Sequence, residues 1–422
     1  MTAIVYPNVA PGVAPLRGVV RGCYVSGDGT IWNAPTGLLP LSTSANASDL
    51  IAALAAMGLT LTRSSVATVQ TSLSTVVTSG IIANVPRVGD GGYGRGLVVE
   101  ETRVNYNPYA RSQATTDGWS SGTVTYTAGA FAGPDGTMNG NRQQVASGNF
   151  GRFRTILTGN TTTTVSLWRR SGTNVAASHA WYISDATSVV NQDNAVPTTW
   201  GRSVLTMATP GGGVAPVNSC DGRTLGPPWN LTAGNRDVAL DLVQAELGKF
   251  ATEAIVTTGA AAQRQPDILT MSAKTLASCI RNGRVAFEFV YIPKYATADM
   301  ISSGNMLFSQ AAPTFNRVYL VSTGAMLVRH NGAAVIASSN TFSNSAFDML
   351  SVYFEFGGNA APYAAIRKNF GARTVFAFPA GVYGNVTSST PATLFSEGGL
   401  VAPTSCWIVS MKACERRPSW AA

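Results

Sequence analysis

Acidic residues are scarce in this sequence. Its 422 residues include 21 Asp and Glu against 29 Lys and Arg, charged residues make up 12% of the chain, and the formal net charge is +8. No run of basic residues is interleaved with aromatics, so the charge pattern disfavours nucleic-acid binding. A diffuse positive field suits approach to an anionic surface such as a capsid exterior or a lipopolysaccharide. The alternative is that the charge only reflects composition.

Cysteine and histidine are equally sparse. The five cysteines form no CxxC pair, and the two histidines, His179 and His330, stand alone, which disfavours a zinc site. We expect no cofactor, and no residue is assigned as a metal ligand. A Ca²⁺ site through Asp side chains and backbone carbonyls on loops stays open, although no compact Asp/Asn loop signature supports it. The cysteines are predicted to be buried free thiols of a protein folded in a reducing cytoplasm. They are Cys23, Cys220, Cys279, Cys406 and Cys414.

Long apolar runs are also missing. No stretch of about 18 apolar residues exists, so the sequence predicts no membrane span. The N-terminus lacks the charged region and apolar core of a signal peptide. If the protein acts outside a cell, we expect it to leave by lysis as part of a particle.

Glycine and proline shape the first part of the chain. Residues 1–40 contain five prolines and predict an extended arm or a few short strands. Such an arm can attach a protein to a larger assembly, and an ordinary flexible tail explains the composition equally well. Residues 41–96 are predicted to hold a short helix that ends at Gly58, followed by a Gly-rich linker.

A short apolar seam follows the predicted helix. Val66, Val69, Leu73 and Val76 are spaced three, four and three residues apart, as the core positions of a coiled coil are. The functional interpretation is a trimeric neck, hence a homotrimer. The run is shorter than the three or four heptads that establish a coiled coil, so a non-coiled helix or a strand stays open.

From residue 97 onward the pattern is that of an all-β protein. Short alternating segments separated by Gly, Asn and Pro turns predict two tandem β-sandwiches, at 97–266 and 267–422. In the second, Val285, Phe287, Phe289 and Tyr291 alternate with other residues along one predicted strand. We expect the segment after Asp267 to have its own core and to fold alone.

A distinctive motif lies between the two predicted sandwiches. Alternation ends near Leu242, and a segment rich in Gly, Ala and Thr leads to an Arg and an Asp. The motif resembles the seam of tandem jelly-roll proteins of tailed bacteriophage virions, although Ala254 and Val256 replace the Tyr and Pro usual there. The matching residues are Gln244, Glu246, Gly248, Ala251, Thr252, Ile255, Thr257, Thr258, Gly259, Arg264 and Asp267.

The resemblance covers roughly residues 97 to 415. It implies that the first sandwich is similar to a carbohydrate-binding module, with Asn105, Arg111-Ser112, Trp119 and the turn 133–137 as matching features. It implies that the second is similar to a concanavalin-A-type lectin sandwich. The family also implies a place on the exterior of the virion.

Catalytic signatures are weak. A glycosidase needs two carboxylates about 5 to 10 Å apart, and no spacing in the sequence indicates a pair, although Glu288 and Glu355 lie on predicted strands. A Ser-His-Asp arrangement has only His179 and His330 to draw on, and no Gly-x-Ser-x-Gly elbow accompanies them. We therefore expect no enzymatic activity.

Carbohydrate recognition has more support. Sugars stack on aromatic rings and accept hydrogen bonds from arginine, and the predicted first sandwich is rich in Trp. The candidate sugar-binding residues are Trp119, Trp168, Trp200, Arg169 and Arg202. The alternative is that most of these rings fill the core.

Together these features predict a non-enzymatic virion structural protein, an exposed appendage or capsid decoration that binds host-surface polysaccharide. A purely architectural cement or fibre protein without a ligand is the first alternative. A glycan-degrading tail enzyme is the second.

Overall fold

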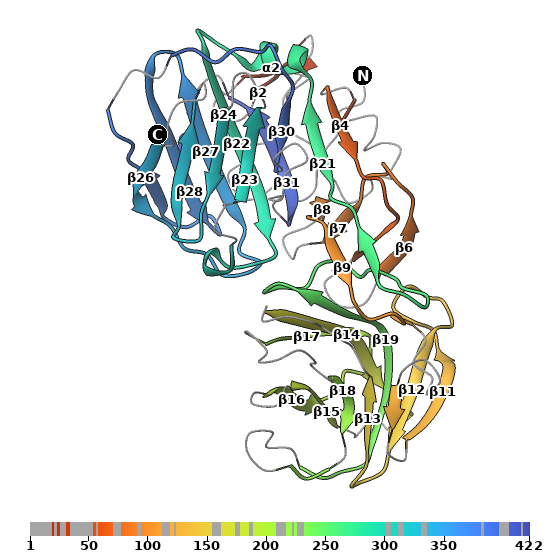
Figure 1. Ribbon diagram of the computed structural model, residues 1–422. Coiled ribbons are helices and arrows are strands. Elements are labelled where there is room, and N and C mark those ends of the chain that lie inside the picture. The colour runs from red at the N-terminus through yellow and green to blue at the C-terminus, as the bar shows by residue number, and fades with distance from the viewer. Residues whose placement is uncertain are drawn as a thin grey trace. The chain divides into compact units, whose positions relative to one another are not determined.

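The chain is mainly β, as the sequence predicts, and is shown in a computed structural model (Figure 1). The structure describes residues 19–20, 23–25, 31–33, 54–55, 58–70, 77–90, 95–111, 119–121, 124–153, 162–173, 178–184, 189–207, 217–221, 223–225, 232–300, 305–310, 316–330, 336–380, 384–395, 405–414 and 417–422.

The chain forms two compact units, and neither is continuous in sequence. The C-terminal unit consists of residues 1–65, 83–101 and 265–422. The central unit consists of residues 66–82 and 102–264. The chain therefore passes between the units four times.

The central unit is a sandwich of two five-stranded antiparallel sheets. One sheet has the order β10(Trp119–Ser121), β13(Phe150–Phe153), β18(Val217–Asp221), β15(Ser178–Ser184), β16(Val189–Ala195). The other has the order β11(Val124–Phe131), β12(Gly140–Val145), β19(Arg236–Leu247), β14(Thr163–Ser171), β17(Gly201–Met207). A small two-stranded sheet joins β9(Arg103–Asn105) to β20(Ala262–Arg264).

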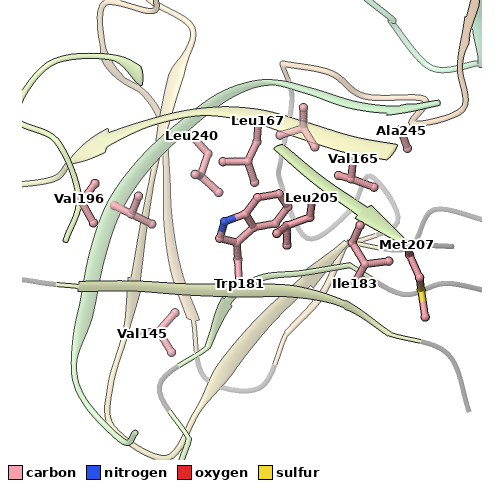
Figure 2. Packing of buried hydrophobic residues seen from close by; sticks show 12 residues of the cluster. Val145, Val165, Leu167, Trp181, Ile183, Val196, Leu205, Met207, Leu240 and Ala245 are labelled. Carbon is pink, nitrogen blue, oxygen red and sulfur yellow. The ribbon is translucent and has the colours of Figure 1, made fainter. Parts of the chain in front are cut away.

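Trp181 occupies the core of this sandwich. Its ring comes from β15 and packs among aliphatic side chains of the facing sheet, including Leu167 on β14, Leu205 on β17 and Leu240 on β19 (Figure 2). Alternate residues of β14 and β19 thus point into the core, as their alternation predicts.

The C-terminal unit holds two seven-stranded antiparallel sheets. The first has the order β26(Ile336–Thr341), β25(Ala325–Arg329), β24(Asn316–Leu320), β23(Asn305–Gln310), β30(Ala392–Leu394), β21(Ile268–Met271), β4(Leu59–Thr62). The second has the order β29(Arg373–Phe376), β28(Ala360–Lys368), β27(Leu350–Gly357), β22(Arg284–Pro293), β31(Cys406–Ala413), β8(Arg95–Val99), β7(Val88–Asp90).

Aromatic side chains fill the space between these sheets. Phe287 and Phe354, from β22 and β27, pack against Phe308 of β23 with ring centroids 5.7 and 6.4 Å apart. Phe289 and Tyr291 both contact Phe395, which follows β30. The alternating residues that the sequence marks as core are therefore core.

The predicted boundaries of the sandwiches need correction. Residues 97–99, expected to open the first sandwich, belong to β8, which pairs with β31 in the C-terminal unit. Strand β4 pairs with β21 of the same unit. Periodicity shows that a segment is a strand but not which distant strand it pairs with, because pairing depends on contacts far along the chain.

The predicted apolar seam is a strand where it is described. Val69 lies in β5(Ala67–Gln70), which pairs with β6(Val77–Ile81), and its side chain is buried. Val66 directly precedes β5 and is 62% exposed. This strand contradicts a helical seam through these two residues, and Leu73 and Val76 lie outside the described residues.

The remaining elements are short. Leu54 and Ala55 are helical, and the Gly58 N–H donates to the Ala55 carbonyl with φ of 65° at the glycine, so the predicted end at Gly58 is confirmed. The rest of that helix and most of the predicted arm lie outside the described residues. Within the arm, β1(Val19–Val20), β2(Cys23–Val25) and β3(Ile31–Asn33) form a small sheet.

Two short helical elements complete the C-terminal unit, α2(Ala273–Cys279) and the 3-10 turn η2(Thr297–Asp299). In the part of the chain that is described, no helix has the length and apolarity needed to cross a membrane. Cys279, Cys406 and Cys414 are buried free thiols, as predicted, and the side chains of Cys23 and Cys220 lie outside the described residues.

Candidate functional site

The motif at residues 244–267, which carries the family resemblance, fastens the segment after β19 to the outer face of its sheet. Gln244 and Glu246 project from β19 on the side away from the core. The Gln244 side-chain oxygen accepts from the Ile255 N–H at 2.5 Å, and the Glu246 carboxylate accepts from the Thr252 N–H at 3.0 Å. These bonds fix residues 252–255 against the outer face of the sheet.

Arginine and threonine side chains complete this arrangement. Arg264 is 1% exposed and donates to the Thr252 hydroxyl and to the Glu253 carbonyl, at 3.3 and 3.2 Å. The Thr257 hydroxyl accepts from the Ala110 N–H at 2.8 Å. Because buried polar groups are costly unless paired, each side chain here has a structural partner.

Glycine is required at one point of the motif. Gly248 has φ of 124°, a backbone conformation that other residues rarely adopt. A Cβ atom at this position would overlap the guanidinium of Arg103. The described residues of the motif therefore form a tightly packed backbone turn, and their contacts are with other parts of the chain.

Two of the predicted sugar-binding rings lie under this segment. Trp168 is 1% exposed and Trp200 is 7% exposed, and both pack with Leu242 and Ala254. The Trp200 ring N–H donates to the Ala132 carbonyl at 2.7 Å. The structure contradicts the exposed position that sugar stacking requires, because residues 251–256 cover this outer face of the sheet.

The predicted arginines are also engaged within the unit. Arg169 is 5% exposed, lies 3.2 Å from His179 Nδ1, and its pKa is lowered to about 10 by burial. Arg202 donates to the Ser166 hydroxyl and the Thr252 carbonyl. The backbone of Trp119 lies in β10, and its side chain is outside the described residues. The five candidates do not form one exposed surface.

A buried carboxyl group sits beside this region. Asp241 lies on β19 opposite Trp168, at a bulge where Leu242 takes a φ of 46°. One carboxyl oxygen accepts from the Leu242 N–H, and the other is buried with no hydrogen-bond partner among the described residues. Burial raises the pKa of Asp241 to about 7, against the opposing effect of the Arg111 charge and the Leu242 N–H.

We expect the stability of the central unit to fall by about 3 kcal/mol as pH rises from about 4 to about 8. An unfolded Asp ionises near pH 3.9, whereas folded Asp241 keeps its proton up to about pH 7. Burial of Asp241 therefore costs no stability below about pH 4, where the carboxyl is protonated in both states. The cost grows as pH rises toward 7 and levels off once folded Asp241 has ionised. Urea unfolding followed by Trp fluorescence at several pH values measures the effect.

Asp241→Asn is the matched control, because an amide of similar size cannot ionise and should remove the part of the pH dependence that Asp241 causes. Burial raises the pKa of nearby Asp135, but hydrogen bonds from Arg111 and Thr137 outweigh it and lower that pKa to about 2. The contribution of Asp135 therefore changes below pH 4, outside the window. Wild type and Asp241→Asn whose stabilities change in parallel from pH 4 to 8 would contradict the prediction.

Two carboxylates meet on the outer face of the C-terminal unit. Glu288 on β22 pairs with Tyr353 on β27, two positions before Glu355, so the two glutamates are diagonal neighbours. The Trp420 ring N–H donates to Glu288 at 2.8 Å. Glu355 accepts from the Tyr353 hydroxyl and forms ion pairs with Arg284 and Arg417. Both carboxylates are nearly buried.

The same face carries an arginine pair that sequence reasoning missed. Arg367 of β28 and Arg373 of β29 are direct partners across the strand pair. The signal in the sequence is the Asn369-Phe370-Gly371 stretch, which is typical of a hairpin turn and predicts that its flanks pair. Alternation alone does not say which residues end up opposite each other.

No family model matches the chain, and no curated protein matches it. Among solved structures, a module and catalytic domain of a Clostridium thermocellum endo-1,4-beta-D-xylanase shows 12% identity over 37% of this chain and 30% of that chain, with a TM-score of 0.26. A tandem of carbohydrate-binding modules from Paenibacillus barcinonensis shows 9% identity over 74% and 98%, with a TM-score of 0.26.

A tail fibre protein of an E. coli phage shows 10% identity over 75% of this chain and 40% of that chain, with a TM-score of 0.17. Likenesses this weak carry no argument about function.

Proposed function

We propose that the chain is a non-enzymatic structural protein on the exterior of a bacteriophage virion, an appendage or a capsid decoration. The observation that supports this most is the buried state of the seam motif. Gln244, Glu246 and Arg264 match the motif of tandem virion proteins, and each holds backbone or a neighbouring side chain in place. The resemblance thus concerns a rigid architectural element, which is what a particle component needs.

We also propose that the protein binds host-surface glycan from its position on the particle exterior. Trp168 and Trp200 are part of the packed interior, so a sugar would be bound elsewhere. If the protein has no sugar-binding site, the first alternative applies: it is a purely architectural cement or fibre component of the virion without a ligand.

The glutamate pair on the C-terminal unit favours a structural role over glycan degradation. Glycosidases need one carboxyl group free to protonate the leaving group and one facing the sugar. Glu355 is instead held by Arg284, Arg417 and Tyr353, and Glu288 by Trp420. A glycan-degrading enzyme remains the second alternative. Release of reducing ends from polysaccharide by the wild type, but not by Glu355→Gln, would support it.

The proposal includes the protein's contacts in the particle: the N-terminal arm binds other virion proteins, and the protein is a homotrimer. Of the four residues proposed to mediate trimer contacts, Val66 is exposed and Val69 is buried within its own unit. Light scattering of the full chain and of Val66→Asp measures the mass, and a monomeric wild type would remove the homotrimer.

Immunogold electron microscopy tests the virion assignment. An antibody raised against the purified chain is applied to particles from lysates of cells that carry its gene. We expect gold on the outside of intact particles, at one repeated position. Label found only on soluble protein, with bare particles in the same field, would overturn the proposal.

A further inference from the structure

The outer face of the C-terminal unit carries a cross-strand arginine pair. Arg367 and Arg373 are directly opposite each other on β28 and β29. In an antiparallel pair, opposite side chains on one face have Cβ atoms about 5 Å apart, and like charges placed there destabilise the sheet. A chain that places two guanidinium groups in this arrangement needs a compensating group of opposite charge.

The described residues supply no such group. Neither Arg367 nor Arg373 forms an ion pair with any carboxylate that the structure describes. The nearby acids are already used, since Asp348 faces Lys368 at 3.5 Å and Glu355 is held by Arg284 and Arg417. The face therefore has an excess of positive charge at the arginine pair.

Aromatic rings flank one of the two arginines. The Arg367 guanidinium carbon lies 4.6 Å from the centroid of the Trp420 ring and 5.4 Å from that of Phe370. Phe370 is 43% exposed at the tip of the β28–β29 hairpin, and Trp420 is half-buried. Stacking between rings orients the guanidinium while leaving its hydrogen-bond donors free for a ligand.

A further polar group in the same row lacks a partner. Ser351 of β27 is directly opposite Arg367 and is 1% exposed. Its hydroxyl and the Arg367 Nε are both buried without a hydrogen-bond partner among the described residues. Buried polar groups are normally paired, yet the neighbouring strand gives the Arg367 guanidinium no hydrogen-bond partner in place of an acid.

We propose that this row, formed by Arg367 and Arg373 with Phe370 and Trp420 beside it, binds the carboxylate of an acidic polysaccharide. The arginines bind the carboxylate through charge-assisted hydrogen bonds. The half-exposed rings contact the apolar face of the sugar that bears it. The proposal deepens the glycan-binding role proposed above, and it places the site on the C-terminal unit and not among the Trp-rich strands of the central one.

The arrangement favours a saccharide over other anions. Nucleic acid is bound by a long basic stripe that follows the phosphate backbone, whereas the basic groups here are two arginines on one hairpin. A single carboxylate with a flat ring beside it fits a pair of arginines flanked by aromatic rings. Binding should be weak for each copy, with a Kd of roughly 0.1 to 1 mM, and adhesion would come from many copies on one particle.

Calorimetric titration of the full chain tests the proposal. The probes are hexagalacturonate, hexamannuronate and the fully methyl-esterified hexagalacturonate, in which the sugar rings are the same and the charge is absent. We expect saturable binding of at least one acidic oligosaccharide and at least about tenfold weaker binding of the ester. Absence of saturable binding of both acidic probes up to about 10 mM, or equal binding of the ester, overturns the proposal.

Arg373→Gln locates the site, because Arg373 is exposed and its side chain donates one long hydrogen bond within the unit, from Nη1 to the Trp420 carbonyl at 3.4 Å. We expect at least about tenfold weaker binding, with an unchanged or slightly higher Tm because the like-charge contact is removed. Lys274→Gln removes the same charge from the exposed side of α2 and is the matched control, expected to bind within about twofold of the wild type.

The outcomes separate cleanly. Equal losses in Arg373→Gln and Lys274→Gln would mean that only net charge matters, and a lower Tm together with lost binding would mean that Arg373 is structural; either result overturns the site. If the antibody labels virions but the purified protein binds neither acidic probe, the virion assignment stands and only this sugar site is overturned.

Discussion

Residues 267–422, expressed without the preceding chain, should fail to form a stable β-sandwich. This reverses the expectation from the sequence that the segment folds alone. The segment lacks β4, the partner of β21, and β8, the partner of β31. Loss of these strands leaves two sheet edges and the buried side chains beneath them open to water and to association with other chains.

The omitted strands also carry buried side chains. Leu97, Val98 and Val99 of β8 are fully buried, and Leu59 and Leu61 of β4 are nearly so. Full burial of one such side chain contributes about 1.5 to 3 kcal/mol, and the whole stability of a domain is only about 5 to 15 kcal/mol. We therefore expect an insoluble product, or one without a cooperative thermal transition.

A spliced chain is the control. Residues 1–65, 83–101 and 265–422, joined by two short Gly-Ser linkers, contain the complete C-terminal unit. Both joints are short, because the Asn84 N–H donates to the Arg63 carbonyl and the Asp267 N–H donates to the Glu100 carbonyl, each at 2.9 Å. This chain should be soluble, with β-type circular dichroism. Cooperative unfolding of residues 267–422 alone would contradict this prediction and would support a domain boundary at Asp267.

Asp267→Ala should lower the free energy of unfolding of the C-terminal unit by about 3 to 5 kcal/mol. Asp267 accepts from Arg63 at 2.9 Å, from Arg87, and from the Glu100 N–H at 3.0 Å. Glu100 in turn binds Arg87 and Lys294. The side chains of Arg63, Arg87, Glu100 and Asp267 are completely buried, so removal of this acid leaves buried cations without enough partners.

Lys368→Ala is the surface counterpart. It removes an exposed ion pair with Asp348, which should change stability by less than about 1 kcal/mol. Urea unfolding of both variants and of the wild type gives the comparison. A loss for Asp267→Ala that is no larger than the loss for Lys368→Ala would mean that the buried network does not hold the unit together.

Local structure was predictable because it depends on residues close in the chain. The alternation of Val285, Phe287 and Phe289 placed β22 and its core face correctly, and Gly58 ended its helix where expected. The motif at residues 244–267 predicts a boundary between units, and one unit does end at Arg264. Periodicity and turn residues carry this information directly.

Long-range pairing decided the rest. Val69 met a heptad pattern, yet it pairs as a strand with β6, because tertiary contacts outweigh a short periodicity. Trp168 was a candidate sugar-binding ring, but Ala254 and Val256 of the returning segment pack against it and cover it.

The candidate site shows the same division. Glu288, Glu355, Arg367 and Arg373 are ordinary strand residues in the sequence, and only the register of four strands brings them onto one face. The sequence by itself determined the β class, the strands and their core residues, since these follow from alternation. The tertiary structure alone decided which strands pair, which tryptophans water can reach and which charges lie opposite one another, because these depend on contacts between residues far apart in the chain.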